Sequence, residues 1–220
     1  MSYPAACSAA RAQGLDVLGG FHGGAEDGLP VDCQTLLLLG PAPDFWPQFR
    51  QSGEYSDRLP DPVDRWSKRV IPQLADELSA VPFLPFGGPP YAPFLSWAIK
   101  TQRAWSSPVG MLVHDTAGLM VSFRGALAFR QKLDLPPTGV RPCDSCTAKP
   151  CLSACPVDAL SAAEGYHTAA CHDYLDTADG QNCLSSGCKA RRACPVSAGA
   201  NRDPEQSAHH MKYFHKPRAF

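Results

Sequence analysis

The chain has 220 residues, with 20 basic and 21 acidic side chains and a formal net charge of -1. A balanced charge argues against a nucleic-acid or membrane-surface partner held by net charge alone. The longest apolar run, Leu36 to Leu39, is far shorter than the roughly 20 residues that a membrane helix needs. The start, Met1 to Pro4, lacks the basic and apolar segments of a signal peptide, so we expect a cytoplasmic protein.

Helices and strands are expected to alternate over the first 130 residues. Apolar spacing and turn residues predict helices at 4–13, 45–50, 62–78 and 94–102. They predict strands at 15–21, 34–39, 81–86, 109–114 and 119–129. The last two strands are expected to pair with each other around a turn at 115–118. This alternation predicts a layered α/β or α+β domain.

A linker signal at 135–139, Leu-Pro-Pro-Thr-Gly, follows this domain. We therefore expect three parts: a first domain at 1–138, a cysteine-rich module at 139–200 and a tail at 201–220. The tail carries His209, His210, Tyr213, Phe214 and His215. A metal site there and packing of its aromatic side chains over a cofactor or the domain junction both fit this composition.

Ten cysteines are many for a cytoplasmic chain, and their placement is uneven. Cys7 and Cys33 stand apart and suit buried apolar positions. The other eight lie between Cys143 and Cys194. In a reducing compartment such a local group is more often a metal site than a disulfide framework.

The first four of these cysteines form the pattern Cys143-x2-Cys146-x4-Cys151-x3-Cys155-Pro156. It matches the bacterial ferredoxin run except for two extra residues between Cys146 and Cys151. Thiolates suit iron–sulfur clusters because the iron takes soft sulfur ligands. A short helix at 156–160 is expected to turn Cys155 toward a second cluster.

The remaining thiols are Cys171, Cys183, Cys188 and Cys194, and Cys194 is again followed by proline. In two-cluster ferredoxins the fourth cysteine of each run ligates the other cluster. One [4Fe–4S] cluster is then expected to take Cys143, Cys146, Cys151 and Cys194. The other is expected to take Cys155, Cys171, Cys183 and Cys188. Zinc and disulfides are the alternatives, although zinc sites rarely use two Cys-Pro pairs.

Several segments resemble known proteins. Gly110 to Gly118, Phe123-Arg124-Gly125 and the cysteine run are similar to the strand pair and ferredoxin module of epoxyqueuosine reductase, which itself resembles reductive dehalogenases. This resemblance implies a nitroreductase-like domain that binds cobalamin beside a ferredoxin-like module with two [4Fe–4S] clusters.

A second resemblance is to CblC-type cobalamin-processing proteins, which remove the upper ligand of cobalamin and lack clusters. It covers Asp61-Pro62-Val63-Asp64, Val113-His114 and Phe123-Arg124-Gly125. It implies that Arg124 helps to hold glutathione near the corrin. His114 suits either a ligand to the corrin or a structural histidine, and Arg124 suits either a carboxylate of the protein or an anionic ligand.

The chain departs from epoxyqueuosine reductase in three ways. Its second module lacks one cysteine of the reductase pattern, so Cys183 would replace it. The segment Trp105 to Pro108 has no counterpart of the catalytic acid, and the C-terminal helical repeats that help to bind transfer RNA are absent. These departures argue against epoxyqueuosine reduction.

The sequence thus predicts an iron–sulfur oxidoreductase that passes electrons through two clusters to a bound corrinoid. The expected chemistry is cobalamin reduction or removal of its upper ligand, with electrons from a ferredoxin, flavodoxin or reductase. Two alternatives stay open: a ferredoxin-like electron-transfer protein without its own substrate, and a reductase that binds flavin. No residue is assigned a catalytic role.

Overall fold

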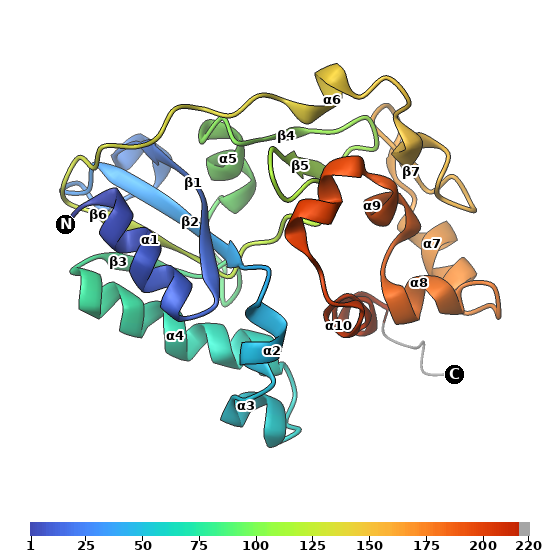
Figure 1. Ribbon diagram of the computed structural model, residues 1–220, viewed down its shortest axis with the longest axis horizontal. Helices are drawn as coiled ribbons and strands as arrows, with labels where there is room; N and C mark the ends of the chain where they lie inside the picture. The colour runs from blue at the N-terminus through green and yellow to red at the C-terminus, as the bar shows by residue number, and fades with distance from the viewer. Residues whose placement is uncertain (216–220) are drawn as a thin grey trace. The chain divides into compact units, whose positions relative to one another are not determined.

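The computed structural model describes residues 1–215, which form two compact units (Figure 1). Unit 1 comprises Met1–Ala104 and Ser122–Val140, and unit 2 comprises Trp105–Val121 and Arg141–Phe220. This division differs from the expected one in two places. Residues 105–121 belong with the cysteine-rich segment, and the tail is part of the same unit.

Unit 1 is built on an antiparallel sheet with the strand order β1-β2-β6-β3 (Figure 1). The strands are β1 (Leu15–His22), β2 (Thr35–Pro41), β3 (Val81–Phe83) and β6 (Gly125–Phe129). The inner strand β2 is buried on both faces, which explains why its leucines run consecutively and do not alternate with polar residues. The expected strands at 15–21 and 34–39 are therefore confirmed.

The longest helix of unit 1 packs against this sheet. Its apolar residues recur at spacings of three and four, so one stripe of the helix is buried. Pro62 occupies the first turn, where a missing N–H costs nothing, and the helix continues through Pro72. The helices of unit 1 are α1 (Tyr3–Ala12), α2 (Phe45–Phe49), α3 (Gly53–Ser56), α4 (Pro62–Leu78) and α5 (Phe94–Lys100), with a 3-10 turn η1 (Ala25–Asp27).

Aromatic side chains join α2 to α4 in the core of unit 1. The Phe45 ring meets the Trp66 ring edge-on with centroids 5.1 Å apart, and it stacks on Phe49 at 5.6 Å. All three side chains are buried. The short aromatic helix expected at 45–50 therefore exists because its rings fill the space between α4 and the sheet.

The strand pair expected at 109–114 and 119–129 is not formed. Only Leu112–His114 (β5) and Gly125–Phe129 (β6) are strands there, and they do not pair with each other. β5 pairs with β4 (Ala104–Ser106), and β6 pairs with β2 and β3. The apolar pattern was sufficient to locate β6, but its partners lie far away in the sequence.

Unit 2 consists mainly of short helices and turns. They are α6 (Pro142–Ser145), η2 (Pro150–Leu152), α7 (Thr168–Leu175), α8 (Gln181–Ser186), α9 (Lys189–Ala193), η3 (Pro195–Ala200) and α10 (Pro204–Phe214). A small hairpin joins β7 (Leu160–Ser161) to β8 (Gly165–Tyr166). The helix expected at 156–160 is absent, because a turn at Pro156 leads directly into β7.

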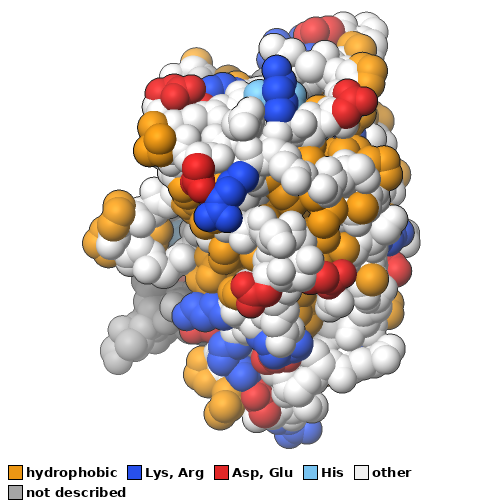
Figure 2. Space-filling model, turned by 90° about the vertical axis from the view of Figure 1, so that its left-hand side faces the viewer, with side chains coloured by type: hydrophobic (Ala, Val, Ile, Leu, Met, Phe, Trp, Pro, Cys, Tyr) orange, Lys and Arg blue, Asp and Glu red, His pale blue; other side chains and the backbone are white. Residues whose placement is uncertain are grey.

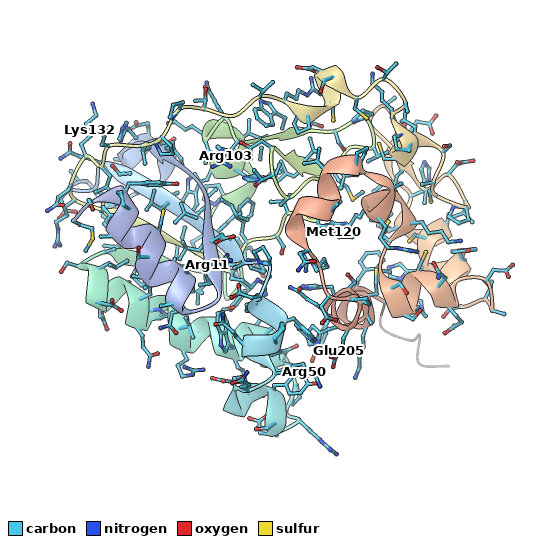
Figure 3. The ribbon with its side chains drawn as sticks, in the orientation of Figure 1. Arg11, Arg50, Arg103, Met120, Lys132 and Glu205 are labelled. Atoms are coloured by element: carbon cyan, nitrogen blue, oxygen red, sulfur yellow. The ribbon has the colours of Figure 1, made fainter. Side chains whose placement is uncertain are left out.

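Hydrogen bonds tie residues 105–121 to the cysteine-rich part of unit 2. Ser197 Oγ accepts from the Leu119 N–H at 3.1 Å. Arg202 donates to the carbonyl oxygen of Met120, a residue labelled in Figure 3, at 2.5 Å. Gly118 lies so close to Ser197 that a Cβ there would come within 2.4 Å of the Ser197 nitrogen. This close approach requires glycine.

Among the described residues, no helix has the length and apolar character to cross a membrane. The face shown in Figure 2 has acidic and basic side chains interspersed, with apolar side chains between them. This distribution agrees with the balanced charge of the sequence.

Candidate functional site

The first cysteine group, Cys143, Cys146, Cys151 and Cys194, surrounds one cavity of about 360 Å³ in unit 2. Cys143 lies on α6 and Cys146 directly follows this helix. Cys151 lies in η2, and Cys194 separates α9 from η3. The extra residues between Cys146 and Cys151 form the loop that leads into η2. The structure thus brings together the four cysteines that the sequence assigns to one cluster.

The sulfur atoms of the first cysteine group influence one another. Burial raises the pKa of Cys143 most strongly, Arg141 lowers it, and the thiolates of Cys151, Cys194 and Cys146 raise it further. Burial and the thiolate of Cys194 likewise raise the pKa of Cys151. Four thiolates at such a site repel one another unless a cation compensates their charge. A bound iron–sulfur cluster would supply that compensation.

The second cysteine group is Cys155, Cys171, Cys183 and Cys188. Burial raises the pKa of Cys171, a hydrogen bond from Tyr166 lowers it, and the other three thiolates of the group raise it. Cys171 lies on α7, Cys183 is buried on α8, and Cys188 precedes α9. Cys183 acts electrostatically on Cys171, and its role as the replacement ligand stays a prediction.

The arrangement of these cysteines bears on whether they form disulfides, bind zinc or bind iron–sulfur clusters. All ten cysteines are free thiols, so no disulfide framework forms. Among residues 1–215, no three His, Cys, Asp or Glu side chains are arranged to hold a single metal ion. A zinc ion draws its four ligands to about 2.3 Å from one point. The thiolates of a [4Fe–4S] cluster bind four different iron atoms, so a cluster does not require four sulfurs around one point.

Two hydroxyl groups lie beside the cysteine groups. Ser107 lines the cavity of the first group and is 3% exposed, and its Oγ has no hydrogen-bond partner among the described residues. The hydroxyl of Tyr166 hydrogen-bonds to the sulfur of Cys171, and burial raises the pKa of this tyrosine. The sequence analysis missed both residues, because neither belongs to a cysteine motif.

Basic side chains near the cysteines have different surroundings. Arg191 donates to the carbonyl oxygen of Leu119 at 2.9 Å, burial lowers its pKa, and it interacts electrostatically with Cys188. Lys149 lines the cavity of the first group. Arg192 donates to the carbonyl oxygen of Gly187 at 3.1 Å. Arg191 therefore acts electrostatically on the second cysteine group.

The aromatic residues at the end of α10 pack beside the second cysteine group. Phe214 stacks on Tyr166 with ring centroids 5.9 Å apart and on His172 at 4.7 Å. His215 hydrogen-bonds to Asp176 and to His172, both at 2.8 Å. Because Tyr166 bonds to Cys171, the tail supports this group indirectly, and the metal site considered for the tail does not form within residues 201–215. Residues 216–220 lie outside the described part.

His114 is completely buried in unit 2. Its Nδ1 accepts hydrogen bonds from the backbone N–H groups of Thr116 and Ala117, both at 3.2 Å. The same nitrogen lies 3.1 Å from the Thr116 hydroxyl and 3.1 Å from Oδ1 of Asp115, so the side chain has a structural role in the turn after β5. The corrin-ligand hypothesis for His114 receives no support from these contacts.

Arg124 lies in unit 1, directly before β6. Its Nε donates to the carbonyl oxygen of Phe123 at 2.9 Å, and its Nη1 lies 3.3 Å from Oδ1 of Asp64. Burial lowers the pKa of the guanidinium, and Asp64 opposes this shift. The expected partner is therefore a carboxylate of the protein. Arg124 and His114 belong to different units, so neither unit alone brings the two candidates together.

Two cavities within unit 1 are smaller than a typical ligand site. One of about 250 Å³ is lined by the loop from Phe86 to Tyr91, and one of about 240 Å³ is lined by Gly19, Gly20 and Arg103. Pockets for drug-sized ligands measure roughly 300–1,000 Å³. Comparison of the chain with protein-family models, with characterised proteins and with solved structures found no significant match.

Proposed function

We propose that this chain is an iron–sulfur redox protein that holds two [4Fe–4S] clusters in unit 2. The observation that supports the proposal is the gathering of eight cysteines into two groups of four, with the membership expected from the ferredoxin crossing pattern. When bound, each cluster supplies a site that takes up and releases one electron at a time.

The linkage between the groups supports electron transfer within unit 2. Cys155 belongs to the second group but follows Cys151 of the first by four residues. Cys194 belongs to the first group but follows Cys188 of the second by six residues. Four residues of extended chain span at most about 14 Å, so the two groups must be near each other. In both places a short stretch of chain links a cysteine of one group to a cysteine of the other and so keeps the two groups close together.

The protein also shapes the surroundings of the first cysteine group. Val113, Leu119 and Val196 give its cavity apolar walls, and Val113 and Leu119 are almost completely buried. Apolar walls exclude water and lower the local dielectric constant, which disfavours extra negative charge on a reduced cluster. The cavity is therefore suited to control the reduction potential as well as to hold iron.

The proposed electron acceptor is a corrinoid, which would undergo reduction or loss of its upper ligand. Sequence resemblance supports this part of the proposal, with glutathione as a cosubstrate near Arg124. A ferredoxin-like protein that only transfers electrons is the second candidate.

Iron and sulfide analysis of protein purified without air tests the clusters. We expect about eight iron atoms per chain and a paramagnetic resonance signal after reduction, as two [4Fe–4S] clusters require. About four iron atoms would reject the second cluster, and one zinc ion in place of iron would reject both.

Titration with hydroxocobalamin separates the candidate functions. A corrinoid protein binds it and changes its visible spectrum, whereas an electron-transfer protein shows no binding at tens of micromolar. Flavin released by acid from the purified protein would favour the flavin reductase instead. The iron analysis is independent of this result.

A further inference from the structure

Ser107 is a buried hydroxyl donor at the cavity of the first cysteine group. It lies in the turn between β4 and β5, outside the cysteine motifs. Both of its backbone polar groups are hydrogen-bonded in that turn. Its N–H donates to the carbonyl oxygen of Met111 at 2.9 Å, and its carbonyl oxygen accepts from the N–H of Gly110 at 3.0 Å. The side chain is therefore not needed to close the turn.

The hydroxyl of Ser107 nevertheless lacks a hydrogen-bond partner among the described residues. Burying an unpaired hydroxyl destabilises a protein, and most buried polar side chains have a partner. Ser107 lines the same cavity as all four cysteines of the first group. An acceptor bound in that cavity would satisfy the hydroxyl.

We propose that Ser107 donates a hydrogen bond to a sulfur atom of the cluster held by the first cysteine group and thereby raises its reduction potential. This assignment rests on the proposed function. Reduction adds negative charge to the cluster, and a donor to its sulfur stabilises the reduced form more than the oxidised form. Tyr166 occupies the corresponding role at Cys171 in the second group.

The test is a redox titration of both clusters in anaerobic protein, followed by paramagnetic resonance. Ser107→Ala should move one cluster to a more negative potential. At the midpoint potential of the wild-type protein, the ratio of oxidised to reduced cluster should rise about threefold to tenfold. A tenfold rise corresponds to a shift of about 59 mV for a one-electron couple. Ser107→Thr keeps the hydroxyl and should restore the potential. Ser106→Ala removes an exposed neighbouring hydroxyl and should change nothing.

Tyr166→Phe supplies the matched comparison, because it removes a donor from the other group. Tyr166→Phe should make the reduction potential of the cluster in the second cysteine group more negative. The inference is overturned if Ser107→Ala leaves both potentials unchanged in protein with a full iron content, or if both variants shift the same cluster. A wild-type protein without iron would instead overturn the proposed function.

The apoprotein gives a second readout that does not depend on cluster retention. Without a cluster the Ser107 hydroxyl has no partner, so Ser107→Ala should leave the unfolding midpoint of the apoprotein unchanged or raise it. In the iron-loaded protein the same substitution should lower the midpoint. A clear loss of stability in the apoprotein would show that the hydroxyl has a structural partner, and the assignment would be wrong.

Discussion

Cys183 carries the most specific prediction at the scale of single residues. It is 6% exposed on α8, and its thiolate interacts with Cys171 of the second group. Replacing Cys183 with Ala should remove one ligand of one cluster, so the iron content should fall from about eight to about four atoms per chain. Iron analysis of anaerobic protein measures this loss.

Cys33→Ala is the control for Cys183→Ala. Cys33 is also buried, at 3% exposed, but it lies in unit 1 and belongs to neither cysteine group. The Cys33→Ala variant should retain the full iron content. Equal losses in the two variants would mean that the change reflects general instability, and retention of all iron by Cys183→Ala would remove Cys183 from the ligand set.

The gathering of Cys143, Cys146, Cys151 and Cys194 at one cavity could be predicted because three of them follow a known ligand spacing in the sequence. The partner of Arg124 could be predicted only as one of two kinds, since Asp64 lies 60 positions away. Ser107 and Tyr166 could not be predicted at all. Their positions beside the sulfurs depend on how residues 105–121 and the β7–β8 hairpin fold into unit 2.

The ion pair of Arg124 and Asp64 gives a second residue-scale prediction. The Arg124 side chain is 13% exposed, so removing Asp64 leaves a largely buried cation without its carboxylate. Because Asp64 itself is 42% exposed, the loss should stay below that of a fully buried pair. Asp64→Asn should lower the free energy of unfolding by about 1–3 kcal/mol, measured by urea denaturation.

The pair of Arg130 and Asp32 is the matched control, because both of its side chains are more than half exposed. Asp32→Asn should lower the free energy of unfolding much less than Asp64→Asn does, since water screens such a pair. If both substitutions cost the same, burial does not strengthen the Arg124 contact, and the argument from its surroundings fails.

At the scale of elements, the helices and strands of unit 1 follow from local patterns, but the pairing of β6 does not. Periodic apolar residues and helix-breaking glycine or proline locate α1, α4, β1 and β2. The strand β6 was expected to pair with its neighbour in the sequence. It pairs with β2 on one edge and with β3 on the other. All five of its residues are buried, as expected for an inner strand of a covered sheet.

Gly125, the first residue of β6, gives a test of how closely α4 packs on the sheet. A Cβ at this position would lie 2.7 Å from Cγ1 of Ile71 on α4. Gly125→Ala should therefore force the helix and strand apart and lower the free energy of unfolding by about 1–3 kcal/mol. Thermal or urea unfolding measures the effect.

Gly53 on α3 is the control for Gly125, because a Cβ there would meet no atom within 4 Å. Gly53→Ala should leave stability unchanged or raise it by up to about 1 kcal/mol through helix propensity. Combining Gly125→Ala with Ile71→Ala, which removes the Cγ atoms that the new Cβ would meet, should cost less stability than the sum of the two single variants. A double variant that is less stable than the sum of the two single variants would contradict the proposed clash.

At the scale of the whole molecule, the two units differ in what stabilises them. The core of unit 1 joins side chains from α1, α2, α4 and the sheet. The apolar cluster around the first cysteine group of unit 2 contains Val109, Val113, Leu119 and Cys151. Small domains with little apolar core commonly depend on metal binding for their stability. Unit 2 should therefore depend on its clusters far more than unit 1 does.

Hydrogen exchange of the iron-loaded protein and of the apoprotein tests this difference. Removal of the clusters should speed amide exchange in residues 105–121 and 141–215 by at least an order of magnitude, because binding energy that favoured the folded state is lost. Amides of β2 and α4 should keep their protection, since their burial involves no cysteine group. Faster exchange throughout both units would show that the chain unfolds as one cooperative body, and unchanged exchange in unit 2 would show that its short helices need no cluster. The second result alone would separate the stability of unit 2 from the ligand role proposed for its eight cysteines.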